Sequence, residues 1–185
     1  SKVVTVQNRP EFMKVFDDPS PFARALSVRE DDLDTSRMPV ELVSTGLPWV
    51  IMPLRSRKAV ERASGNAAEF IEAMKDLPKE VGFYITCLDP LKPGSTTHSR
   101  GFSLISGNVV EDPATGSASG DLGAYLVRNR LVDVKRVTRI VNEQGYEINR
   151  PSRIDIEVRT DEDGTIEPVR VGGSVVHVMD GTAFV

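Results

Sequence analysis

The chain has 185 residues, of which 39% are hydrophobic and 27% are charged, and this balance excludes a disordered chain. The formal net charge is -4 and the basic residues form no run, so the composition argues against a nucleic-acid partner. No apolar stretch approaches the ~20 residues of a membrane span, and the first ten residues lack the apolar core of a secretion signal. We therefore expect no membrane partner.

Cys87 is the single cysteine, so the chain can form no intrachain disulfide. A reducing, cytoplasmic setting is the expectation that follows. The residue lies in the apolar run GFYITCL, where we expect it to be buried and unreactive.

The first half of the chain is predicted to contain four strands and at least two helices. Ser20 is expected to cap the first helix, with Pro21 at its first helical position. Asn66, followed three residues later by Glu69, resembles a capping box that starts another helix. The turn 44–47 joins two strands as in a hairpin. The expected strands are 3–7, 40–44, 48–54 and 82–88, and the first helix is 19–27; an acidic, solvated connection covers 29–34.

The second half contains the best helix, predicted over 118–131. An apolar stripe at helical spacing supports it, formed by Ala118, Leu122, Tyr125 and Leu126. Asp121 is expected in the first turn, and Arg128 and Arg130 in the last turn, where their charges suit the helix dipole.

Strands surround this helix on both sides. The run 153–160 alternates apolar and charged residues, as in a strand with one buried and one solvated face. Gly172–Gly173 separates the last two expected strands, and the chain stops in another strand-like run, TAFV. The expected strands of this half are 98–104, 136–142, 153–160, 165–171 and 174–179. Without regular βαβ alternation, this order favours an α+β fold with a curved, mostly antiparallel sheet around a central helix.

The loop EDPATGSASG (111–120) joins a strand to the best helix. Gly116 allows close backbone approach, and Ser117 is a natural N-cap. Because a helix start offers free N–H groups and partial positive charge, small residues there suit a carboxylate or phosphate. Asp112 is a candidate acid, base or hydrogen-bond partner beside it. The alternative is that Asp112 and Ser117 only cap the helix.

Other candidate residues have plainer expected roles. His98 and His177 are expected to be ordinary surface or packing residues, and their distance from Cys87 in the chain gives no metal-ligand spacing. Trp49 is expected in core or interface packing. Arg153 is expected either to face the ligand cleft or to pair across strands.

The segment EDPATGSA (111–118) resembles the signature of the phenazine-biosynthesis PhzF-like family. Four further segments resemble the family in the same order: 44–54, 100–102, 143–154 and 169–181. The resemblance covers the whole chain and implies the fold of diaminopimelate epimerase. Family members have two similar lobes, each a barrel-like sheet around a helix, with the active site between them. Residues 1–185 are then a single lobe, the C-terminal part of a two-lobed protein whose first lobe is absent.

The resemblance also implies which residues bind the substrate. Asp112 has a supporting role in catalysis, and Thr115 stands where cofactor-free epimerases have a catalytic cysteine. The implied substrate-binding residues are Asp112, Thr115, Gly116, Ser117, Gly172 and Gly173. No cofactor or metal is implied. The general acid/base is a glutamate of the first lobe near a Gly-His pair, and the chain has no counterpart to either.

Two functions remain open from the sequence. In the first, the intact protein is a cofactor-independent isomerase or epimerase in a biosynthetic process, moving a proton on a small carboxylate-bearing metabolite. In the alternative, the chain is a non-catalytic module that binds small anions. In either case the uncovered cleft face favours a homodimer or association with a first-lobe chain.

Overall fold

The computed structural model describes residues 1–36 and 38–183. Within them ten strands form one sheet in the order β1-β10-β9-β8-β6-β5-β4-β3-β2, with β7 paired to β6. All pairs are antiparallel except β4–β5 and β6–β8. The strands are β1 (Lys2–Val6), β2 (Glu11–Val15), β3 (Glu41–Ser44), β4 (Pro48–Pro53), β5 (Gly82–Cys87), β6 (Thr97–Ile105), β7 (Asn108–Asp112), β8 (Val137–Gln144), β9 (Ser152–Arg159) and β10 (Arg170–Ser174).

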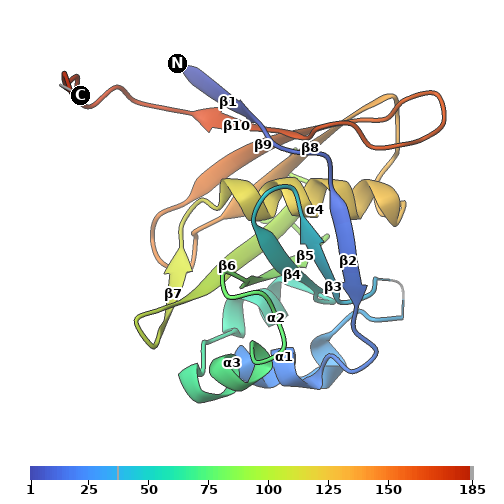
Figure 1. The fold of residues 1–185 in the computed structure, drawn as a ribbon, viewed down its shortest axis with the longest axis vertical. Coiled ribbons are helices and arrows are strands. Elements are labelled where there is room, and N and C mark those ends of the chain that lie inside the picture. The colour runs from blue at the N-terminus through green and yellow to red at the C-terminus, as the bar shows by residue number, and fades with distance from the viewer. Residues whose placement is uncertain (37, 184–185) are drawn as a thin grey trace.

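The sheet curls around one long helix, α4 (Gly116–Arg128), as Figure 1 shows. Leu122, Tyr125 and Leu126 are fully buried there against Ile156 and Val158 of β9. The helix also packs on β3, β4, β8 and β10. The predicted α+β fold, a curved and mostly antiparallel sheet around a central helix, is confirmed.

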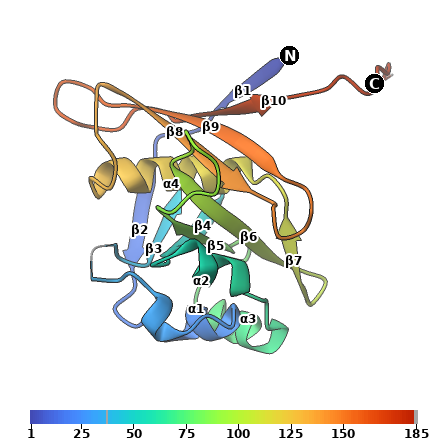
Figure 2. The same ribbon diagram turned by 180° about the vertical axis from the view of Figure 1, so that it is seen from behind.

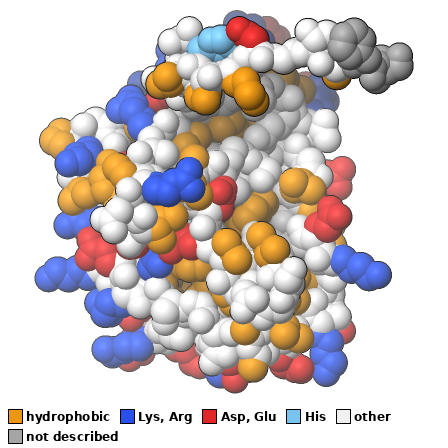
Figure 3. All heavy atoms as spheres, turned by 90° about the vertical axis from the view of Figure 1, so that its left-hand side faces the viewer, with side chains coloured by type: hydrophobic (Ala, Val, Ile, Leu, Met, Phe, Trp, Pro, Cys, Tyr) orange, Lys and Arg blue, Asp and Glu red, His pale blue; other side chains and the backbone are white. Residues whose placement is uncertain are grey.

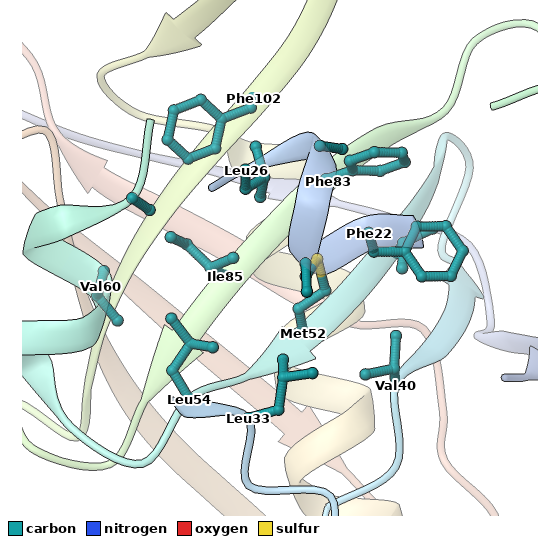
Figure 4. Close-up of a cluster of buried hydrophobic side chains, with 14 of the residues drawn as sticks. Phe22, Leu26, Leu33, Val40, Met52, Leu54, Val60, Phe83, Ile85 and Phe102 are labelled. Atoms are coloured by element: carbon teal, nitrogen blue, oxygen red, sulfur yellow. The ribbon is translucent and has the colours of Figure 1, made fainter. Parts of the chain in front are cut away.

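Three short helices cover the opposite face of the sheet, below it in Figures 1 and 2: α1 (Ser20–Ala25), α2 (Arg57–Arg62) and α3 (Ala67–Ala73). A second core lies between them and the sheet, and Figure 4 shows Phe22, Met52 and Phe83 within it. Phe83 stacks on Phe70 with 4.1 Å between ring centroids. Because β4 and β5 are buried on both faces, they are continuous apolar runs rather than alternating ones.

Several predicted boundaries in the first half hold and others do not. The hairpin of β3 and β4 and the cap of α3 are confirmed, since Asn66 Oδ1 accepts from the Glu69 N–H at 3.3 Å. Ser20 is not a cap, because Pro19 occupies the N-cap position and no side chain caps the helix. The acidic connection contains one short 3₁₀ turn, Glu30–Asp32, and strand β2 was not expected.

The end of the chain differs most from expectation. Gly172 and Gly173 do not separate two strands but lie inside β10. An added Cβ at Gly172 would lie 2.5 Å from the Val3 carbonyl oxygen, so the glycine allows β1 to pair closely. The strand predicted over 174–179 is wrong: 175–183 have no regular structure and no strand partner among the described residues. They project from the body in Figure 1, and the last two residues of TAFV lie outside the described residues.

Cys87 is buried, as predicted, and burial raises the pKa of its thiol to about 11. The residue therefore stays a protonated thiol at neutral pH and is a poor nucleophile. Of the helices in the described ranges, none is long and apolar enough to cross a membrane.

Candidate functional site

The predicted capping of α4 by Ser117 is wrong. The helix starts at Gly116, two residues before the predicted start, and Thr115 occupies the N-cap position without a side-chain cap. The hydroxyls of Thr115 and Ser117 bond to other side chains instead of capping the helix. Thr115 Oγ1 donates to Asp112 Oδ2 at 2.8 Å, and Ser117 Oγ accepts from Trp49 Nε1 at 3.0 Å. The helix also ends earlier than expected, at Arg128, so Arg130 lies outside it.

The first turn of α4 therefore keeps its backbone donors free. Within the described residues, no backbone or side-chain group accepts from the N–H groups of Gly116, Ser117 and Ala118, whereas Ser119 N–H donates to the Thr115 carbonyl at 3.0 Å. Such donors at the positive end of a helix dipole favour an anion. With 13 residues, α4 is the longest helix of those described.

A buried polar network holds the residue before this turn. Gln144 Oε1 accepts from the Thr115 N–H at 3.0 Å, and Gln144 Nε2 donates to the Asp112 carbonyl at 2.6 Å and to Thr115 Oγ1 at 2.8 Å. Tyr84 Oη donates to Gln144 Oε1 at 2.8 Å and accepts from Asn142 Nδ2 at 2.7 Å. Burial raises the pKa of Tyr84 to about 12, so the phenol stays neutral.

This network was not foreseen, although one signal for it is visible in the sequence. Asn142 and Gln144 are alternate residues at the end of strand β8, so both side chains face the same way. Gly101 makes room for the network, because an added Cβ there would lie 2.8 Å from Thr115 Oγ1.

An open groove of about 510 Å³ lies beside the start of α4. It brings Gly116 next to Gly172 and Gly173, so two of the predicted substrate-binding segments meet. An added Cβ at Gly116 would meet nothing within 4 Å, which leaves its backbone open to a ligand. Figure 3 shows this side of the molecule hollowed beneath the projecting terminal segment. Asp112, Thr115 and Ser117 do not line the groove itself.

Arg153 meets the first of its two expected roles and not the second. It lines the groove with Gly116, and its Nε lies 3.4 Å from Asp155 Oδ1. The partner is on the same strand, so the pairing across strands is wrong. His177 is exposed and bonds to Asp180 at 2.9 Å. No three His, Cys, Asp or Glu side chains gather around a possible metal position in the described ranges.

His98 is a buried packing residue rather than a surface one. Its Nδ1 lies 3.1 Å from Glu143 Oε2 and its Nε2 lies 2.7 Å from Glu147 Oε1. Burial alone would lower the pKa of His98, but the two carboxylates raise it overall. Glu111 is engaged as well, since Arg100 bonds both of its carboxylate oxygens. None of these groups lines the groove.

The sequence predicted Asp121 in the first turn of α4, and this is wrong. Asp121 is the sixth residue of the helix and is fully buried. Its Oδ1 accepts from the Thr45 N–H at 2.6 Å, whereas its Oδ2 has no partner among the described residues. Burial raises the pKa of Asp121 to about 8, so the helix-dipole role expected for a charged aspartate does not apply.

Trp49 lies in the core, as predicted, and it connects that core to the start of α4.

An added Cβ at Gly82 would lie 2.2 Å from the Trp49 ring, so we predict that Gly82→Ala displaces the indole and costs about 1–3 kcal/mol of unfolding free energy. In a Trp49→Leu background the same change should cost less, which urea denaturation of the four variants measures. Equal costs in both backgrounds would contradict the clash.

Solved structures share the fold of this chain. A phenazine biosynthesis protein of the PhzF family from Bacillus anthracis superposes with a TM-score of 0.86 at 27% identity, covering 100% of this chain and 61% of the other. A predicted epimerase from Pseudomonas aeruginosa superposes with a TM-score of 0.66 at 33% identity, covering 93% and 55%. The fold is that of diaminopimelate epimerase.

The chain belongs to the phenazine biosynthesis-like (PhzC-PhzF) family, whose model matches residues 1–181. The uncharacterized isomerase YfhB of Bacillus subtilis is 31% identical over 96% of this chain and 55% of its own length. Trans-2,3-dihydro-3-hydroxyanthranilate isomerase of Pseudomonas aeruginosa is 32% identical over 82% of this chain and 50% of its own. The chain thus spans about half the length of the curated relatives it matches, and these relatives are named isomerases.

Proposed function

We propose that this chain is the carboxylate-binding lobe of a cofactor-independent isomerase that moves a proton on a small carboxylate-bearing metabolite. The observation that carries the proposal is the set of N–H groups at Gly116, Ser117 and Ala118 that have no acceptor among the described residues, beside an open groove. The relatives named isomerases support the reaction class. Preorganised N–H groups also stabilise negative charge that develops on a carboxylate-bearing substrate as a proton leaves carbon.

In this proposal the backbone binds the carboxylate and Asp112 orients the rest of the substrate. Thr115 holds one oxygen of the Asp112 carboxylate, and the Asp112 side chain lies at the surface next to the helix start. Ser117 contributes its N–H, and its hydroxyl, which accepts from Trp49, keeps its own proton to donate. Gly172 and Gly173 form the opposite wall of the groove.

The proton-transferring group is proposed to come from a first lobe that covers the groove. Support comes from apolar side chains along β1 and the terminal segment: Val3 and Val4 are about half exposed, and Val176 and Val178 are 86% and 90% exposed. Hydrophobic side chains gather at this segment in Figure 3. A first lobe of the same protein, a first-lobe chain or a second copy would bury them.

Calorimetric titration with 3-hydroxyanthranilate, the aromatic analogue of the substrate named for the Pseudomonas relative, tests the binding role. We predict that the chain binds this carboxylate and binds its neutral carboxamide about tenfold more weakly, because hydrogen bonds to a charged acceptor are stronger. Gly116→Leu should abolish the heat of binding, since the side chain would enter the open groove.

The helix itself should accept leucine, because Gly116 does not have a positive φ and leucine favours helices. Gly181→Leu is the matched control, since an added Cβ there also meets nothing within 4 Å. Binding that survives Gly116→Leu, or equal affinity for the acid and the carboxamide, would show that the helix start is not the carboxylate site.

A further inference from the structure

A series of hydrogen-bonded side chains connects the buried Asp121 to the first turn of α4. Thr45 Oγ1 lies 2.6 Å from Asp121 Oδ1 and 2.5 Å from Gln7 Oε1. Gln7 Nε2 then donates to the Gly116 carbonyl at 2.8 Å. Three segments that are distant in the sequence therefore meet at one point: the end of β1, the β3–β4 turn and α4.

The number of protons available to this series of hydrogen bonds determines the charge of Asp121. The Thr45 hydroxyl has one proton, yet two oxygens lie within 2.6 Å of it. If Asp121 were ionised, one of these short oxygen–oxygen contacts would contain no proton. A proton on Asp121 Oδ1 satisfies both: Asp121 donates to Thr45, and Thr45 donates to Gln7.

Reversing the Gln7 amide does not remove the need for this proton. The reversed amide would place its oxygen 2.8 Å from the Gly116 carbonyl oxygen, so two acceptors would face each other. The side chain has little freedom to move, because Gly120 lies directly beneath it. An added Cβ at Gly120 would lie well inside contact distance of Gln7 Oε1 and 2.9 Å from Thr45 Oγ1.

The surroundings of Asp121 also favour the neutral acid. The residue is fully buried, and its Oδ2 has no protein partner in the described part of the chain, which an ionised carboxylate would tolerate poorly. Burial raises the pKa of Asp121 and outweighs the hydrogen bonds from Thr45, which lower it.

Charged groups on the neighbouring elements have other partners or point away. Glu41 of β3 bonds to Arg128 at 2.9 Å, and Glu143 of β8 bonds to His98. On β9 the charged residues alternate with the isoleucines and valine that face α4. Strand β4 has no charged residue. The remaining charged residues of the elements around α4 are Lys2, Arg139, Arg153, Asp155, Glu157, Arg159 and Arg170, none of them buried.

We propose that Asp121 is a positioning residue, a neutral carboxylic acid that acts through Thr45 and Gln7 to hold the Gly116 carbonyl and so orient the first-turn N–H groups. On ionisation Thr45 donates to Asp121, and Gln7 loses its hydrogen bond to Thr45 and with it the orientation that holds Gly116. The functional role of these hydrogen bonds rests on the proposed carboxylate site. The protonation of Asp121 and its coupling to Gly116 are properties of the ligand-free protein.

A ligand-free pH titration by nuclear magnetic resonance tests the proposal and does not depend on whether the carboxylate site is correct. We expect the Asp121 carboxyl carbon to titrate near pH 8, and the amide signals of Gly116 and Ser117 to titrate with the same midpoint. Gln7→Met should leave the carboxyl titration in place and remove it from the two amides. In Asp121→Asn the amides should show no titration with this midpoint, whereas Asp133→Asn, at an exposed residue, should behave as the parent chain.

Two results would overturn the proposal. One is a carboxyl signal that is already ionised at pH 6. The other is an amide titration at Gly116 that persists in Gln7→Met. Should that variant fail to fold, Thr45→Val removes the same connection with a side chain of nearly the same shape, and the same two results apply to it. Failure of the carboxylate site would appear instead in the calorimetric titration and would leave these signals unchanged.

Discussion

Arg100→Ala is expected to lower the free energy of unfolding by about 3–5 kcal/mol, because it leaves a buried carboxylate without its partner. The guanidinium bonds both oxygens of Glu111, at 3.0 and 2.6 Å, and both side chains are less than 10% exposed. It also donates to the carbonyls of Val60, Glu61 and Ala63 at the end of α2. Urea denaturation measures the loss.

A matched control separates this loss from the general effect of removing an arginine. Arg62 pairs with Asp32 at 3.0 Å on the surface, so Arg62→Ala should cost no more than about 1 kcal/mol. Arg100→Lys should recover only part of the loss, because lysine lacks the planar fork that binds a carboxylate and carbonyls together. Similar costs for Arg100→Ala and Arg62→Ala would mean that the buried cluster does not stabilise the fold.

Raising the pH from about 4 to about 8 is expected to destabilise the chain through Asp121, by on the order of 5 kcal/mol in all. The pKa of this carboxyl is about 8 in the folded chain and about 3.9 when unfolded. The folded chain therefore holds a proton that the unfolded chain releases, so the stabilisation is complete below the unfolded pKa and is lost as the pH rises through the folded pKa. The slope from this group is about 1.4 kcal/mol per pH unit.

Other groups also titrate, so the test compares variants. The raised pKa of His98 destabilises in the same direction as the pH rises, whereas the lowered pKa values of Glu143 and Glu147 act when the pH falls. Asp121→Asn removes only the Asp121 contribution, and its stability should fall less steeply than that of the parent chain between pH 5 and 7. Asp133→Asn should follow the parent chain. Parallel curves for Asp121→Asn and the parent chain would contradict a buried neutral acid.

Local patterns predicted much of the fold. The stripe through Leu122, Tyr125 and Leu126 located α4, and the alternation around Ile156 located β9, because each pattern reports directly on which face is buried. The family signature placed the candidate site at Gly116, and the structure brings this residue next to Gly172 and Gly173.

The features that the sequence did not predict depend on long-range contacts. Ser117 has the residue type of an N-cap, but its hydroxyl accepts a hydrogen bond from Trp49 of β4. Gly172 and Gly173 resemble a turn until β1 pairs against them. The buried, neutral state of Asp121 follows from Thr45 and Gln7, which are 76 and 114 residues away in the sequence. No local pattern contains those partners.

The central claim is that the start of α4 binds a carboxylate through its backbone, and a ligand titration by nuclear magnetic resonance tests it most directly. We predict that 3-hydroxyanthranilate shifts the amide signals of Gly116, Ser117 and Ala118 more than other backbone signals, with smaller shifts at Gly172 and Gly173. The carboxamide should give much smaller shifts at the same concentration. Unchanged signals at these three residues, with shifts elsewhere or none at all, would contradict the account.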